Sequence, residues 1–152
     1  MELVLSIGAV AVVAAVGASW THTGPGTWYA TLDQPTWSPP SWLFAPVWTA
    51  LYLAMAFAVW LVAGEGLERR PVKVAVGAYA VQLVLNFAWT GIFFGLESPG
   101  WALVDINLLW IAILVTAVLF WRIVPSSAWL LVPYLVWVSF AASLNASIVA
   151  LN

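Results

Sequence analysis

The chain has 152 residues, of which 64% are apolar and only 7% are charged. A soluble domain averages about 25% charged residues, so four basic and six acidic side chains are too few to cover a water-exposed surface. The net charge of -2 argues against nucleic acid as a partner, and the absence of cysteine excludes disulfides, thiolate metal ligands and a cysteine nucleophile. We therefore expect an integral membrane protein that lies in the lipid bilayer as a single domain.

Five stretches are long and apolar enough to cross a bilayer, which takes roughly 20 residues of helix. They cover residues 3–20, 43–62, 72–94, 101–121 and 128–151. Prolines mark their boundaries, because proline is tolerated in the first turn of a helix. Strands of a β-barrel would alternate over about ten residues, whereas these stretches are longer and continuously apolar. The sequence therefore predicts an all-α integral membrane protein, a bundle of five transmembrane helices over residues 1–152.

The connections between these stretches predict a lid and an orientation. The first connection, residues 22–41, is long and holds Trp28, Tyr29, Trp37 and four prolines, so we expect it to form an ordered lid. All four basic residues fall on the second and fourth connections, which in a five-span bundle share a side with the N-terminus. Because basic loops stay in the cytoplasm, we expect a cytoplasmic N-terminus.

Polar and aromatic side chains inside the spans recur at spacings of three or four residues, which places each set on one helical face. Such side chains are costly in lipid and tend to face the interior of a bundle. Two interpretations stay open, the wall of a ligand pocket and interhelical hydrogen bonds that hold the bundle together. The sets are Trp48 and Tyr52 in the second span, Gln82, Asn86, Trp89 and Phe93 in the third, and Tyr134, Trp137, Ala141 and Asn145 in the fifth.

Trp101 and Asp105 lie one turn apart in the fourth span. Two interpretations of Asp105 stay open. It is either a carboxylate near the interface, where it is solvated or caps the helix backbone, or a polar group that anchors a ligand inside the pocket. It has no evident titratable partner at depth, which disfavours a proton-coupled pump. The chain has no cluster of His, Asp and Glu for a metal, no Ser-His-Asp set and no phosphate-binding loop, so a conventional hydrolase or dehydrogenase is not expected.

Four blocks of sequence follow one another in a distinctive order. The first block comprises Trp28-Tyr29, Gln34-Pro35, Trp37-Ser38-Pro39-Pro40-Ser41-Trp42, Pro46-Val47-Trp48 and Leu51-Tyr52. The second block comprises Gln82-Leu83, Leu85-Asn86, Trp89 and Phe93-Phe94-Gly95. The third block is Gly100-Trp101-Ala102-Leu103-Val104-Asp105, and the fourth comprises Pro133-Tyr134-Leu135, Trp137, Phe140 and Leu144-Asn145. Together they resemble the translocator protein family, also called tryptophan-rich sensory proteins or peripheral benzodiazepine receptors (TspO/MBR). The resemblance covers nearly the whole chain from Trp28 onward.

The resemblance implies a five-helix bundle, often a homodimer, whose pocket is closed by the first loop. Family members bind porphyrins such as protoporphyrin IX, and isoquinoline or benzodiazepine drugs, with no required cofactor; many also bind cholesterol. Matched by motif, Trp48 and Trp137 would face the pocket and Trp28 and Tyr29 would form the lid. The other positions implied as pocket-lining are Gln82, Asn86, Phe93, Trp101, Ala141 and Asn145.

One departure concerns sterols, because no Lys or Arg follows Tyr134 in the span where animal members carry a cholesterol-recognition segment. Sterol binding there stays an open question, and we expect a prokaryotic cell membrane as the location. Three functions remain in competition: a porphyrin receptor or transporter, an enzyme that degrades porphyrin under light with Trp48 and Trp137 as candidate electron donors, and a structural adaptor in a membrane complex.

Overall fold

The computed structural model describes Gly8, Thr21 and residues 23–152. The first expected span, residues 3–20, therefore lies outside the described residues apart from Gly8. The remaining elements follow in the order α2 (Trp28–Thr31), η1 (Ser41–Leu43), α3 (Phe44–Ala63), α4 (Arg70–Thr90), η2 (Gly91–Gly95), α5 (Pro99–Trp121) and α6 (Pro125–Leu151). The described part of the chain contains helices and no strands, which confirms the all-α fold.

Among the described residues, four helical segments are long and apolar enough to cross a membrane: Ser41–Ala63, Arg70–Gly95, Pro99–Trp121 and Pro125–Leu151. Only 28–33% of the most apolar stretch of each segment is buried inside the protein. The remaining apolar surface is exposed, and in water it would be far larger than a soluble monomer tolerates. These helices therefore present their outer faces to lipid, as an integral membrane protein requires.

Proline sets the start of three of these helices. It occupies one of the first two positions of α4 (Pro71), α5 (Pro99) and α6 (Pro125). The missing proline N–H has no helical acceptor in a first turn, so the residue fixes the start of the helix without breaking a bond. Helix α6 also continues through Pro133.

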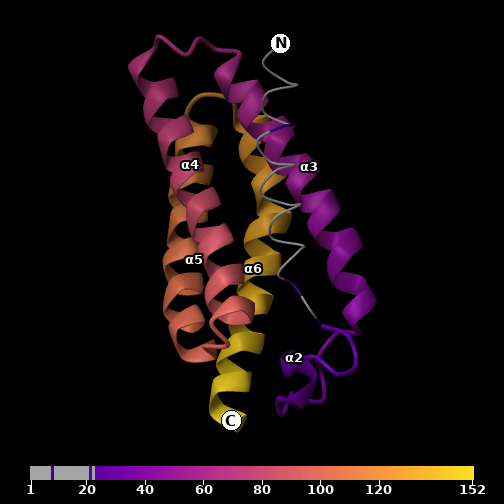
Figure 1. Cartoon of the computed structure of the whole chain (residues 1–152). Helices are drawn as coiled ribbons and strands as arrows, with labels where there is room; N and C mark the ends of the chain where they lie inside the picture. Colours follow the sequence, from indigo (N-terminus) through magenta and orange to yellow (C-terminus); the bar gives the residue numbers. More distant parts are fainter. Residues whose placement is uncertain (1–7, 9–20, 22) are drawn as a thin grey trace.

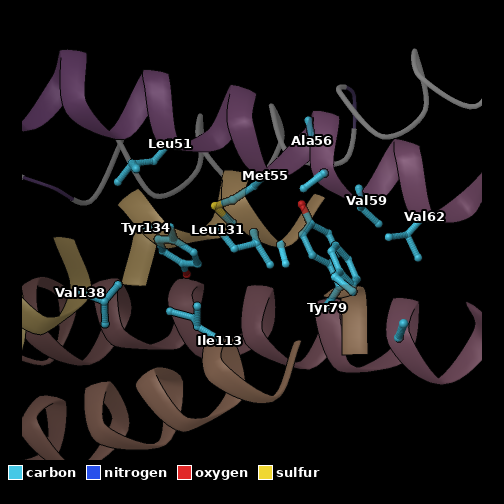
Figure 2. Packing of buried hydrophobic residues seen from close by; sticks show 14 of the residues in the cluster. Leu51, Met55, Ala56, Val59, Val62, Tyr79, Ile113, Leu131, Tyr134 and Val138 are labelled. Carbon is cyan, nitrogen blue, oxygen red and sulfur yellow. The ribbon is translucent and has the colours of Figure 1, made fainter. Parts of the chain in front are cut away.

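The helices pack with α5 between α4 and α6, and with α3 mainly against α6 (Figure 1). Apolar side chains from all four helices meet in one buried cluster. Figure 2 shows Met55 of α3 pointing into the space between α3 and α6, beside Leu131 and Tyr134. Members with at most 2% exposure include Met55, Val62, Val72, Ile106, Leu109, Ile113, Phe120, Leu131 and Tyr134.

The two ends of the bundle differ in charge. The α3–α4 and α5–α6 connections lie at one end, whereas the α2 segment, the α4–α5 connection and the end of α6 lie at the other (Figure 1). Arg69, Arg70 and Lys73 belong to the first end, as does Arg122 at the end of α5. In the described part of the chain, the end that carries α2 has no basic residue. We call this second end the lid end.

Candidate functional site

The aromatic face of α3 points toward α6. Phe44, Trp48 and Tyr52 follow one another at spacings of four residues, which stacks them on one side of the helix. The ring of Trp48 lies 5.4 Å from that of Tyr52 and 6.2 Å from that of Tyr134 on α6. The helices α3 and α6 are therefore joined by an aromatic wall in the half of the bundle nearer the lid end.

A chain of side-chain hydrogen bonds connects this wall to α4. Tyr52 donates from its hydroxyl to Oδ1 of Asn86 at 2.8 Å, and Asn86 Nδ2 donates to the hydroxyl of Tyr134 at 2.9 Å. Tyr134 in turn donates to Oε1 of Gln82 at 2.9 Å. The three hydrogen bonds run from α3 to α4, from α4 to α6 and back to α4. They link three helices through polar groups that would be costly to leave unpaired in the bilayer.

Trp137 lies at the centre of a second set of aromatic contacts. Its ring is 6.0 Å from Phe44 of α3 and 5.4 Å from Phe140 of α6, and Phe140 is 5.7 Å from Trp37 of the first connection. Ala141 follows Trp137 by one turn and is half-buried. Because the side chain of Ala141 is much smaller than that of Trp137, the face of α6 is recessed at residue 141.

Two buried donors at this site have no hydrogen-bond acceptor among the described residues. They are the indole Nε1 of Trp137 and the amide Nε2 of Gln82. Most buried polar groups in folded proteins are paired, and an unpaired donor costs about 1–3 kcal/mol. Such groups are informative because a ligand with acceptor atoms would satisfy them.

The first connection covers the end of α4. Trp28 meets Phe93 edge to face at 5.6 Å, and Tyr29 lies 6.1 Å from Phe93 and 5.8 Å from Phe94. Tyr29 is only 6% exposed, and burial raises the pKa of its phenol above the usual value, so the side chain stays neutral. Gln34 donates from Nε2 to the carbonyl of Tyr29 at 2.9 Å, which holds the segment in shape.

The same connection is tied to the end of α6. Asn152 Nδ2 donates to the carbonyl of Asp33 at 3.0 Å, and its Oδ1 accepts from the N–H of Asp33 at 3.0 Å. This two-point contact joins residues that are 119 positions apart. It ties the first connection to the end of a span; whether this segment acts as a lid stays a prediction.

Trp89, Phe93 and Asn145 stabilise the π-helical turn η2 at the end of α4. The rings of Trp89 and Phe93 stack at 5.1 Å. Trp89 Nε1 donates to Asn145 Oδ1 at 3.2 Å, and Asn145 Nδ2 donates to the carbonyl of Pro99 at 2.9 Å. Asn145 thus connects α4, the start of α5 and α6, so it contributes interhelical hydrogen bonds.

The structure does not bring Trp101 and Asp105 together with Trp48 and Trp137. Trp101 is 71% exposed and lies with Asp105 on the wall of α5, beside η2. The Oδ2 atom of Asp105 is buried without a donor in the described part of the protein. The sequence-predicted set therefore divides into a group between α3, α4 and α6, a group under the lid and this pair on α5.

Comparison with known proteins agrees with the arrangement of helices and aromatic blocks. The model of the TspO/MBR family matches residues 6–151. The chain belongs to this family. It is 45% identical to "Tryptophan-rich protein TspO" of Chlorobaculum tepidum over 152 residues, which cover 100% of this chain and 96% of the relative. It is 44% identical to the human "Translocator protein" over 132 residues (86% and 78%), and 37% identical to the "Tryptophan-rich sensory protein" of Cereibacter sphaeroides over 145 residues (92% and 88%).

This TspO/MBR protein also uses aromatic residues that the helical spacing alone did not single out. Phe44 contacts Trp137, and Phe94 contacts Tyr29 of the lid. Phe44 precedes Trp48 by four residues, so extending the aromatic face of the second span by one turn would have found it. Phe94 carries no such signal, because its position follows from the wider turn of η2.

Proposed function

We propose that this TspO/MBR membrane protein is a receptor or transporter-like protein for porphyrins such as protoporphyrin IX, and for other flat hydrophobic ligands of the isoquinoline or benzodiazepine type. The ligand would lie against the aromatic wall formed by Trp48, Trp137 and Tyr134, between α3 and α6. A macrocycle presents a wide π-face and apolar edges. Aromatic side chains of this kind bind such a face by offset or edge contacts and exclude water from it.

The observation that carries this proposal is the buried indole N–H of Trp137, which has no acceptor among the described residues. Its ring contacts the rings of Phe44 and Phe140, which restrict its rotation. A carboxylate or carbonyl substituent on a flat ligand would supply the missing acceptor. Gln82 Nε2 offers a second donor at the end of the hydrogen-bond chain.

The lid supports the same proposal. Trp28 and Tyr29 cover Phe93 with apolar ring surface, and Asn152 holds the lid backbone at Asp33. Release of these contacts would open the lid end of the bundle to ligand, and their return would exclude water. A role in sensing, transport or regulation of tetrapyrroles fits a site that closes in this way.

A dark titration tests the proposal. The protein in detergent is titrated with protoporphyrin IX, and binding is followed by the absorption band of the porphyrin. We expect saturable binding that weakens about fivefold to tenfold in Trp137→Phe, which keeps an aromatic ring and removes the N–H. The control is Trp129→Phe, on the same helix and 65% exposed, which should bind as the native protein does. Binding that does not saturate would refute the proposal.

A second candidate is light-dependent degradation of porphyrin. It is favoured by the position of Trp48, whose ring lies close to the two tyrosines Tyr52 and Tyr134. If the indole of Trp48 gave an electron to a photoexcited ligand, the neighbouring phenols could in turn give an electron to the oxidised indole. Many cycles of degradation per protein under light would favour this candidate, whereas a single modification per protein would favour binding alone.

We also propose that the end with Arg69, Arg70, Lys73 and Arg122 is cytoplasmic and that the lid end faces outward, in a prokaryotic cell membrane. All four basic side chains belong to one end of the bundle, and basic residues near span ends are retained in the cytoplasm. With the first span added, the N-terminus would share that side.

A further inference from the structure

A hollow with a cavity volume of about 350 Å³ lies on the outer wall of the bundle, where η2 meets α5. It is bordered by Ile92 and Leu96 on one side and by Trp101, Val104, Asp105 and Leu108 of α5 on the other. Trp101, Val104 and Leu108 are more than half exposed, so the hollow opens to the lipid and is separate from the wall of Trp48 and Trp137.

The backbone around this hollow departs from regular helix. η2 is a π-helical turn, in which Leu96 donates its N–H to the carbonyl of Gly91 at 2.9 Å. Glu97 follows with a φ of 50°, in the left-handed region that a non-glycine residue rarely adopts. Wider turns and such strained residues recur at functional sites. Here they separate η2 from the first turns of α5.

Within the part of the chain that the structure describes, Asp105 is the one charged side chain that borders the hollow. It is 8% exposed, and its Oδ2 has no hydrogen-bond donor among the described residues. A buried carboxylate without a donor or a cation is unfavourable, because burial removes its water without replacing it. The polar group that best replaces that water is a cationic donor.

The charges of the lid end favour the same kind of partner. The basic residues of the described chain lie at the opposite end, whereas Glu97 adds negative charge beside the hollow, between the lining residues Leu96 and Ser98. Trp101 is 71% exposed beside Asp105, and an indole face attracts a cation held within about 6 Å of it. An anionic head group would meet only like charge here.

An apolar stripe continues from the hollow along the lipid face of α5. Val104, Leu108, Ile111 and Val115 are spaced by four, three and four residues, and each is 47–54% exposed. This spacing keeps them on one side of the helix for about 16 Å at 1.5 Å per residue. An extended hydrocarbon chain could lie on this stripe while its head stayed at Asp105.

We propose that this hollow binds a single-chain membrane amphiphile with a protonated amine head, which pairs with Asp105 and contacts Trp101 while its hydrocarbon chain follows the stripe on α5. The volume fits a small head and the first carbons of a chain. The site is independent of the porphyrin proposal, since it uses other residues on another face of the bundle.

Native mass spectrometry of the full chain in detergent tests this site with three probes of equal chain length: hexadecylamine, hexadecanol and hexadecanoate. We expect one saturable hexadecylamine per chain, hexadecanol bound at least about tenfold more weakly, and no specific hexadecanoate. Equal affinity for the amine and the alcohol would overturn the proposal, since it would show a chain bound without its charge.

Variants decide which residues hold the amine. Asp105→Asn keeps the shape and removes the charge, and should weaken hexadecylamine about tenfold. Leu108→Trp fills the hollow without altering the carboxylate and should have the same effect, so it decides the outcome if the first variant does not fold. The control is Glu68→Gln, which removes an exposed carboxylate at the opposite end of the bundle and should bind as the native chain does.

Two results would contradict the assignment. One is unchanged hexadecylamine binding in both Asp105→Asn and Leu108→Trp. The other is a second copy on this face, seen as disulfide-linked dimers of Trp101→Cys in a lipid bilayer together with no amine binding. The second result is readable because the native chain contains no cysteine.

Discussion

Tyr134 and Gln82 form a hydrogen bond of 2.9 Å between two side chains that are almost completely buried, one on α6 and one on α4. The same tyrosine hydroxyl accepts from Asn86 at 2.9 Å, so one phenol of α6 serves two amides of α4. The bundle therefore depends on this hydroxyl at the depth where a ligand would meet the aromatic wall. The structural role seen here and the binding role proposed above therefore fall on the same residues.

Replacement of this hydroxyl should lower the stability of the bundle. Tyr134→Phe leaves Asn86 Nδ2 without its acceptor and Gln82 Oε1 without its donor, and we expect a loss of about 1–2 kcal/mol in the free energy of unfolding. Titration with a denaturing detergent, followed by circular dichroism, measures this loss. The matched control on α6 is Ser147→Ala, whose exposed hydroxyl bonds only within its own helix, and which should change little. Equal stability of the two variants would contradict the structural role of the network.

Loss of the contact between Asn152 and Asp33 should loosen the lid. Asn152→Ala removes both hydrogen bonds to the backbone of Asp33, so we expect faster hydrogen exchange in residues 24–43 and faster dissociation of ligand. Exchange in α4 and α5 should stay the same. Asn107→Ala provides the control, because Asn107 is an exposed asparagine that bonds only to Leu103 of its own helix. Unchanged exchange in the lid would contradict a role of the contact between Asn152 and Asp33 in holding it.

The proposed orientation predicts which thiols can be labelled in whole cells. Single cysteines can be introduced without interference, since the native chain has none. A maleimide that cannot cross the membrane should label Thr36→Cys in the lid segment and should not label Glu68→Cys in the α3–α4 connection; both positions are exposed. Lysed cells, in which both should react, provide the control. The reverse pattern would place the lid end in the cytoplasm.

The membrane class, the helical fold and the four spans among the described residues could be predicted from the sequence, because they follow from long apolar runs and from prolines such as Pro71 and Pro125. The π-helical turn at Gly91–Gly95 could not, because its wider hydrogen bonding depends on contacts with α5 and α6 that no local pattern records. Trp28, Tyr29 and Phe93 were singled out from the sequence, whereas the contact between Tyr29 and Phe94 depends on that turn.

The candidate site shows the same division. Spacing placed Gln82 and Asn86 on one face of α4, but the sharing of one Tyr134 hydroxyl between them depends on how α6 is aligned with α4. Trp101 is a different case. Because lipid is as apolar as the interior of the bundle, the sequence pattern of α5 cannot tell its inner face from its outer face. The position of Trp101 on the outer wall therefore required the structure.

The central claim is that a porphyrin lies beside Trp137, and a paramagnetic ligand can locate it. Copper protoporphyrin IX is added in the dark to protein that carries one nitroxide label, at Ala141→Cys or at Ser126→Cys. Both positions belong to α6 and are about 22 Å apart along the helix axis. We predict strong relaxation enhancement of the label at residue 141 and little at residue 126. Equal enhancement at both positions, or stronger enhancement at residue 126, would contradict the proposed site.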